Sequence, residues 1–234
     1  MSCKLLRILR PKSGIYVVNR STLVSDDEVK RWAAVCARQL AEHVAPAYRR
    51  APVRVQFLSA ASHAPKGSWV IAVLDDSDQA GALGWHTEDA AGRVYGRVFA
   101  RPCLDYNVPV SATLSHEVVE MYCDPDVDRW IDTGKGYEVA YEACDPVEGD
   151  SYFIDGVPVS DFVTPAWYMR KPPVDAALSY LDGVAEPFTL AAGGYLVRRF
   201  PDGSEDQVFG TAANRAYVAA KRHQLARTAR RVGS

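Results

Sequence analysis

Closely spaced cysteines are missing from this sequence. The chain has five cysteines among its 234 residues, an odd number, and no two of them form a C-x-x-C pair. Disulfide frameworks and thiolate zinc knuckles both depend on paired or closely spaced cysteines, so neither class of protein fits this chain. We therefore expect reduced thiols.

Long hydrophobic runs are missing as well. No apolar stretch approaches the roughly 20 residues that a membrane-spanning helix needs, so no membrane partner is expected. Near the start of the chain, Lys4, Arg7 and Arg10 interrupt the apolar residues, which leaves no apolar core for a signal peptide. The sequence predicts a protein that is not secreted by a signal peptide and stays in the cytoplasm where it is made.

Charge of one sign is scarce in two regions, although the formal net charge is only −2. Residues 117–161 hold thirteen acidic side chains and two basic ones. The residues after Asp206 hold six basic side chains and no acidic one. The first region is therefore suited to bind cations, and the basic tail is suited to meet an anionic surface.

The first half of the chain carries alternating strand and helix signals. Four segments are predicted as strands from β-branched residues, period-two alternation or a continuous apolar run: 15–24, 53–58, 69–74 and 92–101. Ser25 and Glu28 form a capping box that begins a helix after the first strand, and Pro46 ends this helix. The strand over 92–101 has partly alternating basic residues, so we expect it at an edge of the sheet.

The second half is predicted to contain shorter elements. We expect a short helix over 137–145 and a hairpin over 152–163 around Asp155-Gly156. After the two prolines at 172 and 173, three short strands are predicted: 188–190, 195–200 and 207–209. The chain is thus expected to divide into a domain over 1–170 and a small β-rich C-terminal subdomain over 171–234 that carries the basic arm.

A helix over 112–123, capped by Ser111, carries the residues that point to a metal. His116 and Glu120 stand four residues apart, so both can face one ion, and Glu117 lies beside them. In the related H-E-x-x-H pattern the two outer residues are ligands and the glutamate acts as general base. His116 and Glu120 are therefore predicted as metal ligands, and Glu117 as the catalytic base.

A third ligand is expected, because catalytic zinc sites usually have three protein ligands. On the predicted helix over 137–145, Glu138, Glu142 and Asp145 share one face. Glu142 is the predicted third ligand, and Asp145 or Glu138 is expected to orient the ligands or join them. His86 is predicted as a competing ligand or as a hydrogen-bond donor to the transition state.

Three segments, 114–120, 141–148 and 159–167, together resemble a zincin-like family with an H-E-x-x-E motif that is encoded in bacteriophage and bacterial genomes. The likeness extends to further segments: 17–22, 74–83 and 228–231. The resemblance implies an α/β (α+β) fold in which a metal-site helix lies beneath a mixed sheet. It implies the fold more directly than an activity.

The sequence departs from a standard metallopeptidase at Glu120, which stands where the second histidine would be. A carboxylate adds negative charge to the ligand shell, which weakens a bound ion as a Lewis acid. Its oxygen is also a harder ligand than an imidazole nitrogen. We expect a divalent metal, with zinc first and manganese, calcium or magnesium as alternatives. In the alternative without a metal site, His116 and Glu120 are only an exposed ion pair on a helix.

Two functions remain open on the sequence alone. The first is a metal-dependent hydrolase, most simply a peptidase acting on a peptide substrate. The second is a structural virion component of the capsid or tail, located in the virion, with a zincin-like fold and a degenerate or purely stabilising metal site. Among the basic residues of the tail, over 215–231, Tyr217 is the only Phe, Trp or Tyr, and the tail has no nucleic-acid-binding module. It is therefore expected to dock on an acidic protein partner, such as a virion subunit, rather than on nucleic acid.

Overall fold

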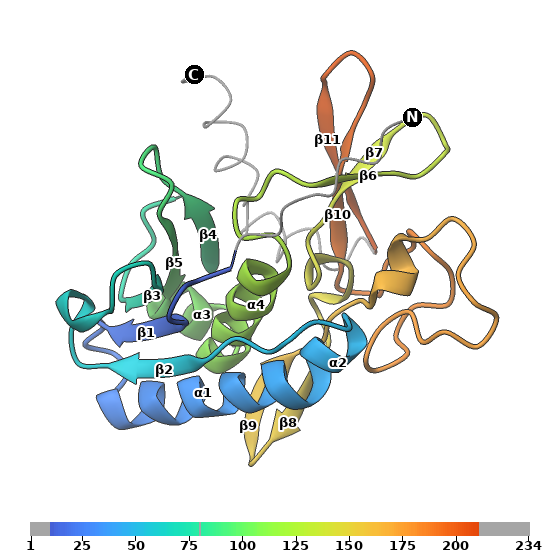
Figure 1. The fold of residues 1–234 in the computed structure, drawn as a ribbon. Coiled ribbons are helices and arrows are strands. Elements are labelled where there is room, and N and C mark those ends of the chain that lie inside the picture. The colour runs from blue at the N-terminus through green and yellow to red at the C-terminus, as the bar shows by residue number, and fades with distance from the viewer. Residues whose placement is uncertain (1–9, 80, 211–234) are drawn as a thin grey trace.

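The computed structural model describes residues 10–79 and 81–210. The predicted basic arm, from residue 211 onward, lies outside the described residues. The described part of the chain is a mixed α/β structure with three sheets and few helices (Figure 1). None of its helices is both long enough and apolar enough to cross a membrane. The four cysteines within it are free and buried.

The main sheet has five strands. In spatial order they are β2 (Val55–Leu58), β1 (Ile15–Asn19), β3 (Trp69–Leu74), β5 (Val94–Phe99) and β4 (Gly84–Glu88). The first four strands are parallel, and β4 runs antiparallel to β5. The side chains of Ile15, Ile71 and Val98 belong to the main core. β-Branched residues in β1, period-two alternation in β2 and a continuous apolar run in β3 made these strands predictable from the sequence.

The edge of this sheet differs from the prediction. The strand predicted over 92–101 corresponds to β5, which lies between β3 and β4 rather than at the edge. The edge strand on that side is β4, which the sequence analysis missed. Its residues, Gly-Trp-His-Thr-Glu, show no alternation of apolar and polar types because nearly all of them are buried.

One long helix covers a face of the main sheet. Helix α1 (Asp26–Gln39) begins with the predicted capping box, in which Ser25 accepts from the backbone of Glu28 and the Glu28 side chain accepts from the backbone of Ser25. The helix continues through a π-helical turn (Leu40–Val44) and α2 (Ala45–Ala47), so it runs slightly past the predicted stop at Pro46. Its buried face joins the core under β1 and β2.

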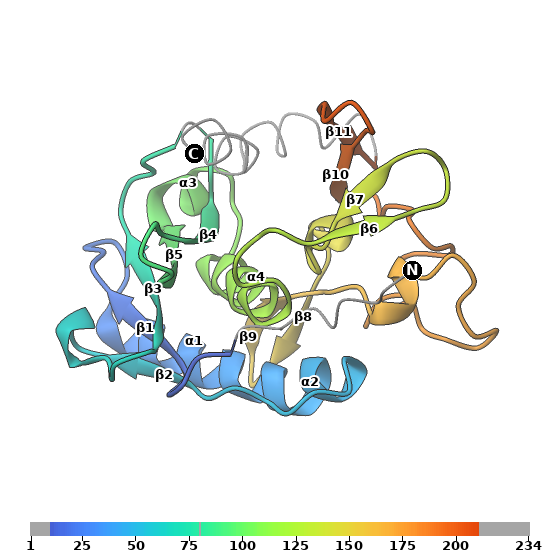
Figure 2. The ribbon, with the colours of Figure 1, turned by 45° about the horizontal axis from the view of Figure 1, so that its top comes forward.

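Helix α4 (Val110–Cys123) lies between the main sheet and the second sheet in both views (Figures 1 and 2). It follows the short helix α3 (Ala100–Asp105). The predicted cap at Ser111 is wrong, because α4 begins after Pro109 and the Ser111 hydroxyl donates to the Pro158 carbonyl at 2.8 Å. All fourteen residues of α4 are buried, so its polar face is covered rather than open.

The second sheet has four antiparallel strands. They are β11 (Glu205–Phe209), β10 (Tyr195–Arg199), β7 (Glu138–Ala140) and β6 (Trp130–Asp132). The predicted helix over 137–145 is therefore wrong, because its first residues form β7 and pair with β10. Strands from both sides of residue 171 share this sheet. The division into two domains at that point stays a prediction.

Two smaller features complete the fold. The predicted hairpin around Asp155-Gly156 is confirmed as β8 (Ser151–Ile154) and β9 (Val157–Ser160), and β9 packs on α4. The strand predicted over 188–190 does not form. Instead, the segment 191–194 closes over the turn at 145–147, where the Ala191 amide donates to the Pro146 carbonyl at 2.9 Å. A Cβ atom on Gly194 would lie 1.9 Å from that same carbonyl oxygen, so only glycine fits there.

Candidate metal centre

His116 is the point on which two carboxylates converge. Its Nε2 atom lies 3.1 Å from Oε2 of Glu120 and 3.3 Å from Oδ1 of Asp145. His116 and Glu120 come from one face of α4, and Asp145 begins the 3-10 turn Asp145–Val147. The exposed fractions of the three residues are 2%, 3% and 4%. This burial excludes the alternative in which His116 and Glu120 are an exposed surface pair.

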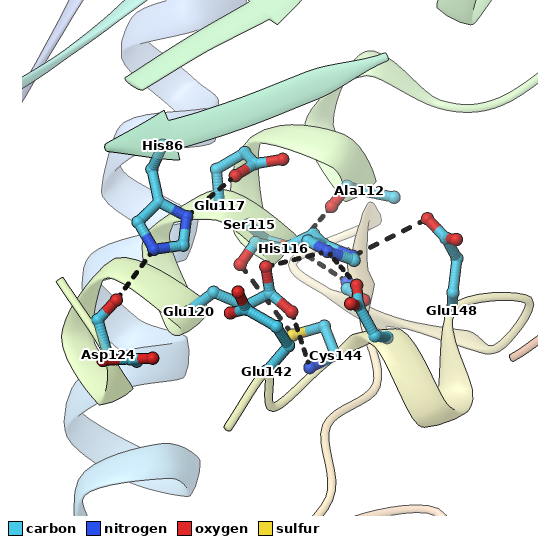
Figure 3. A network of polar contacts seen from close by, with 12 residues as sticks. His86, Ala112, Ser115, His116, Glu117, Glu120, Asp124, Glu142, Cys144 and Glu148 are labelled. Carbon is cyan, nitrogen blue, oxygen red and sulfur yellow. Dashed lines mark hydrogen bonds and ion pairs between the residues drawn. The ribbon is translucent and has the colours of Figure 1, made fainter. Parts of the chain in front are cut away.

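Glu120 is held in place from its other side. Its Oε1 atom accepts a hydrogen bond from the backbone N–H of Cys144 at 3.1 Å (Figure 3). The Cys144 thiol in turn donates to the His116 carbonyl at 3.8 Å. The loop after β7 is thereby tied to α4 just before Asp145, which brings residues about 25 positions apart in sequence to one place.

A second pair of ionisable groups lies beside the first. His86 on β4 has its Nε2 atom 2.9 Å from the Asp124 carbonyl and its Nδ1 atom 3.2 Å from Oε2 of Glu117. The side chains of His86 and Glu117 are 3% and 0% exposed. Strand β4 approaches α4 closely here, since a Cβ atom on Gly84 would lie 2.8 Å from Oε1 of Glu117. Figure 3 shows both histidines and the carboxylates between and around them.

Two further carboxylates complete this region. Glu142 is buried on the same loop as Cys144, and its backbone carbonyl accepts from the Tyr168 hydroxyl at 2.8 Å. Glu148 approaches the opposite side of the His116 ring, with Oε1 at 4.0 Å from Nδ1. Glu138 does not join them, because its side chain accepts from Arg199 at 2.9 Å on the second sheet.

The charges of the centre are unbalanced in the negative direction. Five carboxylates and two imidazoles are all at most 7% exposed: Glu117, Glu120, Glu142, Asp145, Glu148, His86 and His116. Burial and the charge of Asp145 raise the pKa of Glu120 to about 8, although His116 opposes this. Burial disfavours a charged His86, but its hydrogen bond to the Glu117 carboxylate and the surrounding carboxylates outweigh this and raise the pKa of His86 to about 9. Buried negative charge of this density is stabilised by a cation or by protons.

The donor atoms are grouped as a metal ion would require. One group is formed by His116, Glu120 and Cys144, and another by His86, Glu117 and Glu120. Within each group one ligand atom per residue lies within 4.8 Å of the others, and all five residues are buried. Glu120 belongs to both groups. Imidazole nitrogen with carboxylate oxygen suits zinc and manganese, and the donor set therefore fits a divalent ion.

The centre is reached from a cavity of about 280 Å³. His116 and Glu148 form part of its wall. Tyr106 and Asn107, in the loop before α4, line it on one side, and Gly149 and Gly193 approach each other closely at another. A small molecule or a side chain that entered this cavity would meet the His116 side of the centre.

Comparison of the chain with models of protein families, with curated proteins and with solved structures gives no match. The resemblance to a zincin-like family therefore stays a prediction from the sequence.

The residues predicted from the sequence are largely brought together. His116, Glu120, Asp145 and Glu142 surround one place, and Glu117 and His86 form the adjoining pair. Asp145, which the sequence analysis named as a residue that orients the ligands or joins them, lies 3.3 Å from Nε2 of His116. Glu148 was missed as a site residue. Its position three residues after Asp145, in the same acidic segment, was the available signal.

Proposed function

We propose that this protein is a metal-dependent hydrolase with a zincin-like fold, in which His116, Glu120 and Asp145 hold one divalent ion. The observation that carries the proposal is the convergence of two buried carboxylates on Nε2 of His116, in a centre that opens to a cavity. The placement of α4 beneath a mixed sheet with one antiparallel edge strand supports the fold assignment. Zinc is the first candidate for the ion, with manganese, calcium or magnesium as alternatives.

The surroundings of His116 support a role as a ligand. Metal-binding histidines present one ring nitrogen to the ion, and the other ring nitrogen faces an oxygen that orients the ring. Here Nε2 faces Glu120 and Asp145, and Nδ1 faces Glu148. Glu142 adds negative charge beside Glu120 and is the further carboxylate that can complete the shell.

A bound divalent ion would supply a Lewis acid that polarises a substrate carbonyl and activates water. Glu117 is the residue that we propose takes the proton from water as general base. Its Oε2 atom is fixed by His86, which in turn is oriented by the Asp124 carbonyl. This arrangement holds the carboxylate of Glu117 in one orientation while a proton is transferred.

A peptide is the substrate class that the cavity supports best. Ligand pockets for whole small molecules have volumes of roughly 300–1,000 Å³. The cavity beside His116, at about 280 Å³, falls just below that range. It is therefore suited to one side chain of an extended substrate. The basic tail, which has no acidic residue, supports a separate contact between this protein and an acidic protein partner.

Elemental analysis and peptide hydrolysis together test this function. Protein purified without chelator is expected to carry about one divalent ion per chain, as catalytic zinc sites do. His116→Ala and Asp145→Ala should lose it while remaining folded. The matched control is His63→Ala, which removes an exposed histidine far from α4 in sequence. A peptide library should be cleaved by the metal-loaded protein and not after chelation.

The outcomes separate the proposals. Cleavage that survives complete removal of metal, or the absence of any bound ion at every concentration tried, would overturn the hydrolase. A tightly bound ion without hydrolysis of any peptide would favour the structural alternative, in which the centre only stabilises the fold.

A further inference from the structure

The centre contains a second set of possible ligand atoms beside the set proposed for the first ion. This set consists of one ring nitrogen of His86 and one carboxylate oxygen each of Glu117 and Glu120, all within 4.8 Å of one another. It is contributed by β4 and α4, whereas the first set also needs Asp145 from the loop after β7. Glu120 is the residue common to both sets.

The orientation of His86 suits a metal ligand. A carbonyl oxygen can only accept a hydrogen bond, so Nε2 of His86 must donate to the Asp124 carbonyl 2.9 Å away. Nδ1 is the ring nitrogen that faces Glu117, and an ion that bound there would displace the proton between Nδ1 and the Glu117 carboxylate. A ring that is oriented through N–H donation to a backbone carbonyl is the usual arrangement behind a metal-binding nitrogen.

The negative charge of the centre is sufficient to attract a second cation. A single divalent ion carries two positive charges, fewer than the negative charges that the five buried carboxylates can carry. Glu117 and Glu120 are separated by less than one helical turn on α4, and Glu142 contributes to the field at both Glu120 and His86. The His86 side of the centre therefore retains negative potential after the first ion is bound.

We propose that His86, Glu117 and Glu120 form a second, weaker divalent-cation site, and that an ion bound there switches the hydrolase off. The inhibition rests on the proposed function, because the ion occupies the carboxylate that serves as general base. Affinity is lower than at the first site for two reasons. The second ion must break the His86–Glu117 hydrogen bond, and it is repelled by the first ion across the shared Glu120.

Titration with metal ions, monitored by calorimetry, tests the second site without relying on activity. Apo protein titrated with Mn²⁺ or Zn²⁺ should show two binding phases. His86→Ala should weaken the second phase by roughly a hundredfold and retain the first, since one of the second ion's ligands is lost. His63→Ala, the exposed control, should retain both phases.

Electron paramagnetic resonance with Mn²⁺ provides an independent readout. The first equivalent should give the six-line spectrum of an isolated ion, and the second equivalent should broaden it because the two ions share Glu120. Hydrolysis should rise with the first equivalent and fall with the second. Glu117→Gln keeps the size of the side chain and removes its charge, so it should also weaken the second phase and spare the first.

The results distinguish this inference from the proposed function. A single binding phase in the native protein would overturn the second site and leave the hydrolase standing. Two unchanged phases in both His86→Ala and Glu117→Gln would also overturn it. If His86→Ala does not fold, Glu117→Gln alone decides between these outcomes. The absence of any binding phase would overturn both proposals.

Discussion

At the scale of single residues, the centre depends on which nitrogen atom of each histidine faces inward. Each histidine has one ring nitrogen directed at carboxylates and the other directed at an oxygen, which is Asp124 for His86 and Glu148 for His116. The His86 ring therefore resists rotation, since turning it would move its buried N–H away from the Asp124 carbonyl. Glu120 is the residue that connects the two histidines.

Glu117→Gln isolates the role of the proposed base. The amide keeps the shape of the side chain but cannot take a proton, so the turnover number should fall by roughly a hundredfold or more. The first ion should be retained, because Glu117 is not among its ligands. Steady-state kinetics of a cleaved peptide, with elemental analysis of the same sample, checks this. Glu42→Gln, in an exposed helical ion pair with Arg38, is the matched control.

Sequence reasoning at this scale succeeded where helical spacing decides the geometry. The i, i+4 relation of His116 and Glu120 was predictable because α4 is a regular helix. The same reasoning failed for the segment 137–145, which is a strand, a loop and the start of a 3-10 turn rather than a helix. Glu138 therefore turns toward Arg199, while Asp145 reaches His116.

At the scale of elements, close approach of backbones decides where the centre can form. Gly84 lets β4 lie against α4, and Gly194 lets the segment 191–194 lie against the turn that carries Asp145. The sequence analysis did not use either glycine, since nothing near them signals which distant backbone they meet. The polar face of α4 is covered, because β9 packs against this helix and the loop after β7 is hydrogen-bonded to Glu120.

Gly194→Ala should disturb both stability and metal binding. The added methyl group would overlap the Pro146 carbonyl, which cannot move without shifting Asp145. We expect a loss of more than about 2 kcal/mol in the free energy of unfolding, as for other overpacked sites, together with weaker binding of the first ion. Denaturant unfolding and metal titration measure the two effects.

Gly203→Ala is the control for this variant. Gly203 has a φ of +82° in the turn between β10 and β11, and a Cβ atom there meets nothing within 4 Å. The alanine should cost stability through backbone strain and leave metal affinity unchanged. Equal metal affinity in both alanine variants would show that the contact at Pro146 does not position the centre.

At the scale of the whole molecule, local signals predicted most of the strands but not their partners. The main sheet follows from apolar patterns in β1, β2, β3 and β5, whereas the second sheet joins β7 to β10 across some sixty residues. No pattern within either short strand specifies that pairing. The residues of the centre that lie on α4 were predictable, because their spacing along one helix is local. The position of the third ligand was not, because distant contacts place the loop after β7.

Overall stability should depend on pH through Asp161, which lies outside the metal centre. Burial raises the pKa of this carboxyl from 3.8 to about 6, although the backbone N–H groups of Phe162 and Leu181 stabilise its charged form. The folded state thus binds the proton more tightly than the unfolded chain. The stabilisation that this provides is complete below about pH 4 and is lost as the pH rises through 6.

Asp161→Asn tests this dependence. The amide oxygen can still accept from both N–H groups, and no charge has to be buried at neutral pH. The free energy of unfolding of the variant relative to the native protein should therefore increase between pH 4 and pH 7 by on the order of 2 kcal/mol. Denaturant unfolding of both proteins at matched pH values measures the difference. A constant difference across this range would contradict the assignment.

The closure of 191–194 over the turn at 145–147 also has a consequence for the order of events during synthesis. A ribosome makes the proposed ligands His116, Glu120 and Asp145 well before it makes Gly194 and strand β10. Until those later residues emerge, the turn that carries Asp145 lacks its backbone partner at Pro146, and β7 lacks its neighbour in the second sheet. A nascent chain therefore completes its metal centre only after these later residues have been made, so a truncated product that stops before residue 191 would be released without a fully formed centre.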